Sequence, residues 1–281
     1  NSNQWFYSGI NDSVFDSANF YTSESSADKT KRVYGIGGNL WVFSETSYEI
    51  FARTGNASNP FASPFGNSGT VGLVGYDAIC ELDNTVFWIG SGKTANCGVY
   101  SGSASGKLTK ISDAGLDNVL RTCKYLHDAK AFAYRLNGCS HVVFTSVSDG
   151  LTFSYEIEAN SWSLRSSSKN GKQSYWDTTE AVISYNGDCY TGSIKTNKLS
   201  KMTVASVKDA EENPISILWQ SPIFIADLKQ FVLKQLVVDV ESGKSKSYTE
   251  EPKLFLQVSR DGETWGERRI LELGVRGEYN K

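Results

Sequence analysis

The chain has 281 residues, of which 40% are hydrophobic, 12% aromatic and 21% charged, and its formal net charge is −3 at pH 7. This length suffices for one large all-β domain or two smaller ones. No stretch approaches the length of apolar sequence that a membrane span needs. No run of Lys or Arg exceeds a pair, which argues against a strong, static grip on nucleic acid.

A short phrase, a Gly/Asn turn followed by a dense apolar run, recurs along the first two thirds of the chain. Its turn residues Asn39, Asn84, Asn137 and Asn186 are 45, 53 and 49 residues apart. A strand-rich repeat at this period is typical of propeller blades. We therefore predict an all-β fold, an irregular β-propeller.

Two of the apolar runs, residues 40–43 and 86–89, are hydrophobic on both faces. This pattern predicts inner strands that lie between neighbouring blades. The outer strands are then expected at residues 48–51, 99–100 and in a hairpin around Phe153. One short helix is expected between blades, capped by Ser112 or Asp113, with Leu116, Val119 and Leu120 on one side.

The composition changes between residues 202 and 214, where a polar segment ends in Pro214. We predict propeller blades over residues 1–205 and a less regular, strand-rich region over residues 206–281, either a closing blade or a small appended sheet. Strands are expected there at residues 215–219, 231–240, 253–259 and 268–273. The absence of an initial Met suggests a fragment of a longer protein.

Several motifs that resemble catalytic or binding sites fail on inspection. Gly90-Ser91-Gly92-Lys93-Thr94 lacks the earlier glycine of a phosphate-binding loop and is predicted to be a hairpin tip. The only two histidines, His127 and His141, exclude a His-rich zinc site. The five cysteines are scattered, which predicts free thiols in a reducing compartment. We expect no catalytic, cofactor or metal site.

Two features remain as candidate sites. The segment Ser259, Asp261, Gly262, Thr264 and Trp265 resembles the Asp-box hairpin of sialidases and related propellers, but it is one residue short. In that hairpin the residues have a structural role in the turn. The aromatic residues Trp5, Phe6, Tyr7, Tyr175 and Trp176 are candidates for a sugar-binding platform.

Read in order, a series of phrases matches one known family over nearly the whole chain. The phrases are Phe6-Tyr7-Ser8-Gly9, Ser47-Tyr48-Glu49-Ile50-Phe51, Trp88-Ile89-Gly90, Gly98-Val99-Tyr100, Thr152-Phe153-Ser154-Tyr155-Glu156 with Ser161-Trp162, Ser259-Arg260-Asp261-Gly262 and Gly277-Glu278-Tyr279-Asn280. In these phrases the chain resembles the packaged-DNA stabilisation proteins, the tail hub or head-completion proteins of short-tailed phages of the Salmonella and Shigella type. It departs from the family pattern at Gly138-Cys139-Ser140-His141, which carries an insertion, and at Ser112-Asp113.

The resemblance implies a structural protein of the virion tail, assembled in the bacterial host cytoplasm, and no enzyme. Copies would form a ring, expected to be a hexamer, that closes the channel below the portal and adaptor, helps to retain packaged DNA and anchors the tail needle. Contact with tailspike is also expected, while DNA would pass without sequence-specific binding. The alternative is a carbohydrate-binding or sialidase-like propeller on a phage tail or bacterial surface, which an arginine cluster facing a tyrosine and a carboxylate would favour.

Overall fold

The computed structural model describes residues 2–9, 11–64, 67–93, 97–169, 172–183, 186–195, 197–206, 208–209, 213–224, 232–243 and 251–278. The chain is nearly all-β, with 47% strand and 5% helix, and it divides into two units, Asn1–Ser216 and Ile217–Lys281. Over the described ranges, no helix is long and apolar enough to cross a membrane.

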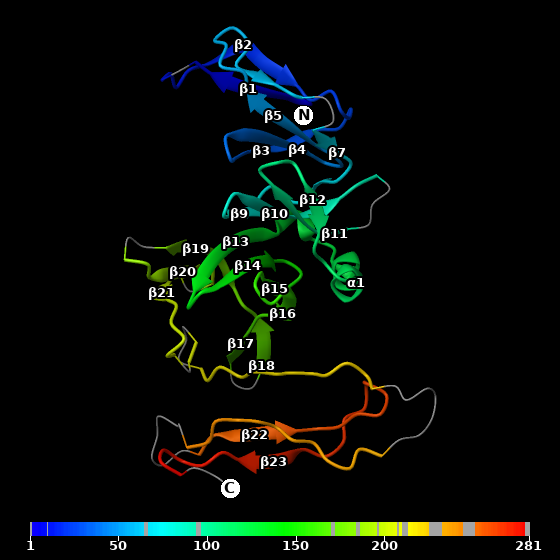
Figure 1. The fold of residues 1–281 in the computed structure, drawn as a ribbon, viewed down its shortest axis with the longest axis vertical. Helices are drawn as coiled ribbons and strands as arrows, with labels where there is room; N and C mark the ends of the chain where they lie inside the picture. The colour runs from blue at the N-terminus through cyan, green and yellow to red at the C-terminus, as the bar shows by residue number, and fades with distance from the viewer. Residues whose placement is uncertain are drawn as a thin grey trace. The chain divides into compact units, whose positions relative to one another are not determined.

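The first unit is a series of small antiparallel sheets (Figure 1). It opens with a two-stranded sheet of β1 (Gln4–Ser8) and β2 (Phe15–Thr22), followed by a first blade of β3 (Thr30–Ile36), β4 (Asn39–Ser44), β5 (Tyr48–Arg53), β6 (Phe61–Ala62) and β7 (Ser68–Gly69). The second blade consists of β8 (Gly72–Leu73), β9 (Ile79–Leu82), β10 (Thr85–Ser91), β11 (Gly98–Ser103) and β12 (Leu108–Lys110).

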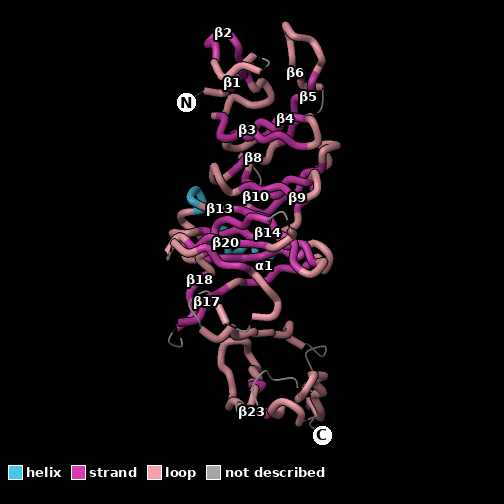
Figure 2. Tube along the Cα trace, turned by 90° about the vertical axis from the view of Figure 1, so that its left-hand side faces the viewer, coloured by secondary structure: helices cyan, strands magenta, loops and turns pink. Residues whose placement is uncertain are grey.

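Helix α1 (Ala114–Thr122) and the short 3₁₀ turn η1 (Leu126–Asp128) lead to the third blade. That blade consists of β13 (Lys130–Leu136), β14 (Cys139–Ser146), β15 (Leu151–Glu156) and β16 (Ser161–Leu164). A hairpin of β17 (Ser166–Lys169) and β18 (Lys172–Tyr175) precedes the fourth blade of β19 (Thr178–Ile183), β20 (Cys189–Ser193) and β21 (Leu199–Lys201). Seen from the side, the blades form successive layers (Figure 2).

In the first three blades the repeated Gly/Asn phrase lies at a two-residue turn, between β3 and β4, β9 and β10, and β13 and β14, and in the fourth blade it lies in a longer connection between β19 and β20. Its residues take positive φ at Gly37 and Gly38, at Asp83 and Asn84, at Asn137 and Gly138, and at Gly187. Two-residue hairpin turns of type I′ need positive φ at both central positions, which Gly and Asn tolerate best. The repeat in the sequence is therefore a repeat of turn geometry, and the predicted propeller-type fold with one short helix is confirmed.

The assignment of inner and outer strands needs correction. The apolar runs at residues 40–43 and 86–89 lie in β4 and β10, which are second strands with a neighbour on each side. The predicted outer strands at residues 48–51 and 99–100 belong to β5 and β11, and most of their side chains are buried. The predicted outer hairpin around Phe153 consists of β15 and β16, of which β16 is at the edge of its sheet as predicted. Since each blade face packs on the next blade, the middle strands are shielded from water on both faces. The outermost strands are the short β6, β12 and β16.

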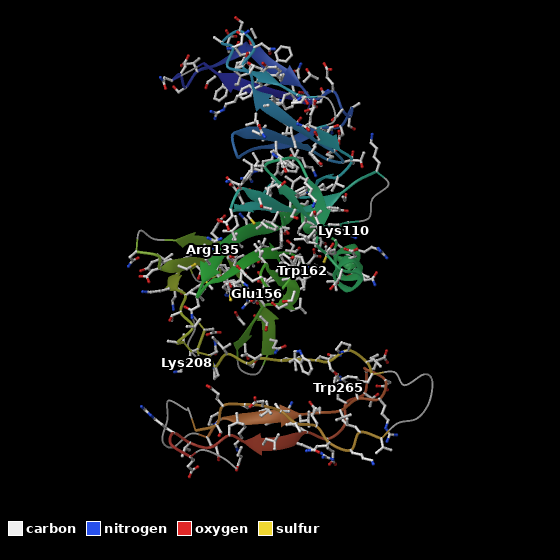
Figure 3. All side chains as sticks on the ribbon, viewed as in Figure 1. Lys110, Arg135, Glu156, Trp162, Lys208 and Trp265 are labelled. Carbon is white, nitrogen blue, oxygen red and sulfur yellow. The ribbon has the colours of Figure 1, made fainter. Side chains whose placement is uncertain are left out.

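The first three blades share one apolar core, and separate apolar clusters join the first sheet to the first blade and the third blade to the fourth. Trp41 of the first blade and Trp88 of the second are fully buried, with ring centroids 6.1 Å apart. Trp162 of the third blade donates its indole N–H to the carbonyl of Ile111 at 2.8 Å, between the second and third blades (Figure 3). Strands β13 and β14 pack on the fourth blade through a second cluster, in which Phe132, Tyr134, Val143 and Cys189 are buried together.

Helix α1 begins at the predicted cap. The carboxylate of Asp113 accepts a hydrogen bond from the amide of Leu116 at 2.7 Å, which satisfies a free N–H of the first turn. Leu116 and Leu120 are buried as predicted, whereas Val119 is largely exposed. The third buried residue of the helix is Asp117 instead. Its carboxylate accepts a hydrogen bond from the hydroxyl of Ser112 at 2.6 Å and pairs with Lys110.

Among the described residues of the second unit, β22 (Lys253–Leu256) pairs antiparallel with β23 (Arg269–Glu272). The predicted strand at residues 253–259 is therefore confirmed in its first four residues, and the one at residues 268–273 is confirmed in its central part. Residues 215–219 and 232–240 form no regular strand, contrary to the prediction. A strand needs a partner for its backbone groups, and apolar content by itself does not supply one.

Candidate functional site

The predicted Asp-box-like segment folds into one tight turn of the second unit. The hydroxyl of Ser259 donates to the carboxylate of Asp261 at 2.9 Å and accepts from the amide of Gly262 at 2.8 Å. The same carboxylate oxygen accepts from the amides of Glu263 and Thr264 at 2.9 and 2.7 Å. Gly262 has a φ of 81°, which a residue without Cβ adopts without strain.

This turn is closed by a β-bridge between Ser259 and Trp265. The side chain of Trp265 is 44% exposed. The amides of Thr264 and Glu263, together with the Ser259 hydroxyl, lower the pKa of Asp261 below its ordinary value of 3.8. The described geometry suits a carboxylate that fixes a turn, and we propose this structural role for the motif.

Replacing Asp261 with alanine should unlock this turn, because the amides of Glu263 and Thr264 lose their acceptor. Hydrogen exchange of these two amides is expected to accelerate, with little change in the first unit. In the native chain the pKa of Asp261 lies below its ordinary value, so the ionised carboxylate stabilises the turn fully at any pH above that ordinary value. This stabilisation is lost only as pH falls through the lower, folded-state pKa.

Glu263→Gln is the matched control, because the side chain of Glu263 is exposed and only its amide takes part in the turn. Unchanged exchange in Asp261→Ala, or equal acceleration in both variants, would show that the carboxylate does not hold the turn.

The candidate aromatic platform is not assembled. Trp5 and Tyr7 face the first blade, and on this side of the sheet Trp5 also stacks on Tyr21 of β2 with centroids 5.0 Å apart. Phe6 lies on the opposite face of β1 and is 46% exposed. Tyr175 lies under the ammonium group of Lys195 at 4.1 Å, and Trp176 packs against Phe132 in the core between the third and fourth blades.

Each described histidine is part of local packing. The ring of His141 stacks on Tyr134 with centroids 5.0 Å apart. Burial and the nearby guanidinium of Arg165 lower the pKa of His141, so the imidazole is neutral at pH 7. His127 lies in η1 with its ring edge-on to Tyr125. Within the described ranges, no three His, Cys, Asp or Glu side chains lie close enough together to hold a metal ion.

The motif predicted as a hairpin tip begins in the last residues of β10, and the tip itself lies partly outside the described residues. Gly90 and Ser91 end β10, and β11 returns antiparallel from Gly98. A Cβ at Gly90 would lie 2.5 Å from the Val71 side chain and 2.9 Å from the Gly72 carbonyl. Glycine is therefore required here by strand packing. The last residue of the motif, Thr94, lies outside the described residues.

The arginines of the first unit that bear on the sialidase-like alternative are engaged with different partners. Arg32 pairs with Asp77 at 2.7 Å and lies over the ring of Tyr34. Arg135 pairs with Asp83, and Arg165 approaches His141. These contacts join neighbouring strands and blades, and they do not combine the three arginines into one cluster.

All five cysteines are free thiols, as predicted. Cys80 and Cys189 are buried, while Cys97, Cys123 and Cys139 are partly exposed. Burial raises the pKa of Cys97 to about 11, so its thiol is protonated and a poor nucleophile at neutral pH.

One surface went unrecognised in the sequence. Phe6 and Phe20 lie opposite each other on β1 and β2 with ring centroids 6.0 Å apart, and Phe15 lies opposite Ser8 further along. All three are exposed, by 46%, 43% and 64%. We call this the phenylalanine face. The sequence indicates this face through three consecutive aromatic residues, Trp5 to Tyr7, because side chains that alternate along a strand place aromatic rings on both of its faces.

Two family models match the chain and leave only a short gap between them. The first, a phage stabilisation model described as bacteriophage P22 Gp10, beta-propeller, matches residues 1–207. The second, described as bacteriophage P22 Gp10, beta-sandwich, matches residues 216–281. A comparison with curated proteins found no match. The chain therefore belongs to the bacteriophage P22 Gp10 family, the structural stabilisation and tail hub proteins of short-tailed phages, which act in the virion tail among other virion components.

Proposed function

We propose that this tail hub protein forms a ring of copies, a hexamer, that closes the channel below the portal and adaptor. In this role it helps to retain the packaged genome, anchors the tail needle and contacts the tailspike, and it catalyses no reaction. The ring assembles in the cytoplasm of the bacterial host. The observation that carries the proposal is that the family matches extend over both the propeller and the C-terminal region.

Exposed apolar surface supports a role in assembly. Ile217, Leu218 and Trp219 are 94%, 83% and 81% exposed, and the phenylalanine face adds three aromatic rings on the first unit. Monomeric soluble proteins rarely leave large contiguous apolar patches in water, and such patches mark interaction sites. A hub that contacts several virion proteins requires surfaces of this kind.

The charge distribution supports passage of DNA without specific binding. The net charge is −3, and several basic side chains are already paired, Arg32 with Asp77, Lys110 with Asp117 and Lys130 with Asp77. Each phosphate contact made by a free Lys or Arg releases counterions and strengthens binding. A channel wall with compensated charge would therefore slow transiting DNA little.

The test is a native mass measurement of the full chain with purified portal–adaptor complex and with purified tail needle. We expect the chain to join both, and to add six copies to the portal–adaptor complex. Particles that lack the chain should release their DNA, and addition of the chain should prevent this release. The chain mixed with an unrelated virion protein serves as the control for nonspecific association.

Failure to join either the adaptor or the needle would overturn the proposal. Binding to one only would remove the role assigned at the other end of the ring. A glycan array run beside the mass measurement distinguishes the carbohydrate-binding alternative, which requires glycan binding by a chain that does not assemble with virion proteins.

A further inference from the structure

A two-stranded hairpin between the third and fourth blades belongs to neither blade. Among the described residues, β17 and β18 pair only with each other, from Ser166 opposite Tyr175 to Lys169 opposite Lys172. The hairpin extends away from the third blade (Figure 1 and Figure 2). Strand β13 of the third blade lies directly beside β19 of the fourth, so the hairpin is not needed to join the two blades.

The hairpin is basic. Residues 165–176 contain Arg165, Lys169 and Lys172, and they contain no Asp or Glu. The ladder places Lys169 and Lys172 directly opposite each other at its outer end. Like charges at directly opposite positions destabilise a pair of strands. A bound polyanion would remove this repulsion, so the sequence of the hairpin favours contact with a negatively charged partner.

Two further lysines lie in the turn beside the base of the hairpin. The ammonium group of Lys195 lies 4.1 Å from the centroid of the Tyr175 ring in β18, which is a cation–π contact. Lys198 lies in the same turn, where its carbonyl accepts a hydrogen bond from the amide of Ser193 at 3.2 Å. Both lysines are exposed, and neither forms an ion pair with another described residue. Positive charge is therefore present at both ends of the hairpin.

The carboxylates near this base are held by hydrogen bonds of their own loops. Burial and the charges of Asp177 and Asp128 raise the pKa of Tyr175, which agrees with a position of both carboxylates close to the base. Asp177 accepts a hydrogen bond from the hydroxyl of Ser193 at 2.5 Å, and Asp128 accepts one from the amide of Ser148 at 3.1 Å. The negative charge thus stays at the base, and residues 166–175 carry positive charge only.

Exposed hydrogen-bonding side chains accompany these charges. Ser166, Gln173 and Ser174 are exposed on the two strands. Contacts to the phosphates of DNA come from Lys and Arg together with Ser, Gln and Tyr side chains, and a two-stranded ribbon fits the major groove of B-DNA. Recognition of protein carboxylates relies more on the planar fork of Arg, which the outer end of the hairpin lacks. Composition and shape therefore favour a nucleic-acid backbone over an acidic protein surface.

We infer that the β17–β18 hairpin binds the phosphate backbone of duplex DNA, whatever its base sequence. This inference deepens the proposed role in retaining the packaged genome and rests on that role. Each phosphate that a lysine neutralises releases counterions, so salt weakens the contact. One hairpin offers few such contacts and holds DNA weakly, whereas the hairpins of a six-membered ring act together on one duplex.

The test is fluorescence anisotropy of a labelled, random-sequence duplex titrated with the full chain at several salt concentrations. Lys169→Gln combined with Lys172→Gln should weaken binding by roughly tenfold or more at low salt. It should also reduce the slope of log K against log salt by about 1.8, which is about 0.9 for each lost phosphate contact. Lys169→Arg with Lys172→Arg keeps the charge and should bind like the native chain.

The matched control is Lys29→Gln with Lys107→Gln, which removes two exposed lysines of the same unit from positions outside the hairpin. Its affinity and salt slope should equal those of the native chain. An equal loss in both Gln pairs overturns the inference, because the loss then reflects net charge alone. The inference is also overturned if the native chain binds no DNA at low salt, or if it binds poly-L-glutamate more tightly than the duplex, because an acidic protein is then the partner.

Assembled particles separate this inference from the proposed function. Particles built with the Lys169→Gln, Lys172→Gln chain should contain as many copies of the chain as native particles, and they should release more DNA. Normal assembly with normal DNA retention overturns the inference alone. Loss of assembly with unchanged DNA affinity overturns it too, since the lysines then contact a virion protein. Failure of the native chain to join the portal–adaptor complex overturns the proposed ring and leaves the measured DNA affinity of the hairpin unchanged.

Discussion

Replacing Gly72 with alanine is expected to destabilise the propeller unit by about 1–3 kcal/mol, toward the upper end of that range. Gly72 lies in β8 at the contact between the first two blades. A Cβ there would lie 2.3 Å from the carbonyl carbon of Glu45 and 2.4 Å from the carbonyl oxygen of Ser44. These are backbone atoms that cannot rotate away, so β8 must move from β10 or the blades must separate. Urea unfolding followed by tryptophan fluorescence measures the loss.

Gly35→Ala is the matched control. Gly35 lies in β3, and an added Cβ would meet no atom within 4 Å. Replacing glycine with alanine at an unstrained position tends to stabilise by restricting the unfolded chain, so no loss is expected. If both variants unfold at the same urea concentration, the blades are not in such close contact at Gly72.

The propeller scaffold was predictable because its signal is local. Gly, Asn or Asp residues with positive φ set the two-residue turns of the first three blades, and the following apolar run fills the next strand. Both are read directly from short stretches of sequence. The order of strands within a blade was harder, because a strand such as β5 loses water through contact with a neighbouring blade. That contact is made by residues far away in the sequence. The pattern of apolar and polar residues within β5 therefore does not reveal where the strand lies in its blade.

The candidate sites were predictable only in part. Hydrogen-bonding residues two and three positions apart define the Ser259 turn, and the structure brings them together. The five aromatic candidates could not be sorted from sequence, because Trp5 and Phe6 are neighbours whose side chains point to opposite faces of one strand. The domain boundary at residues 205/206 remains a prediction. The described structure divides after Ser216, and the family matches leave residues 208–215 between them.

Replacing Trp88 with alanine should give the largest loss of stability, about 3–5 kcal/mol. Trp88 is fully buried. The centroid of its ring lies 5.1 Å from that of Phe43 and 6.0 Å from those of Tyr48 and Tyr100. Alanine would leave a cavity between the first and second blades that these rigid rings cannot fill. Urea unfolding of the full chain measures the change in the free energy of unfolding.

Two further variants separate cavity formation from other effects. Tyr76→Ala removes an exposed ring of the same unit and should change stability by less than about 0.5 kcal/mol. The loss of stability in Trp88→Phe should lie between the losses in Trp88→Ala and Tyr76→Ala. Trp88→Phe keeps one ring, and the buried indole N–H that it removes has no hydrogen-bond partner among the described residues. Equal losses for Trp88→Phe and Trp88→Ala would contradict the cavity argument.

The shape of the Trp88→Ala transition tests how the blades share stability. Trp88 belongs to a buried cluster that includes Ile50 of the first blade, Val99 of the second and Phe144 of the third. Because these side chains pack as one core, the three blades should lose structure together in a single transition at lower urea concentration. A separate early transition, with the remaining blades unfolding as in the native chain, would mean that each blade is stable by itself. The hub would then be a chain of independent sheets, and loss of one contact would leave the rest of the propeller in place.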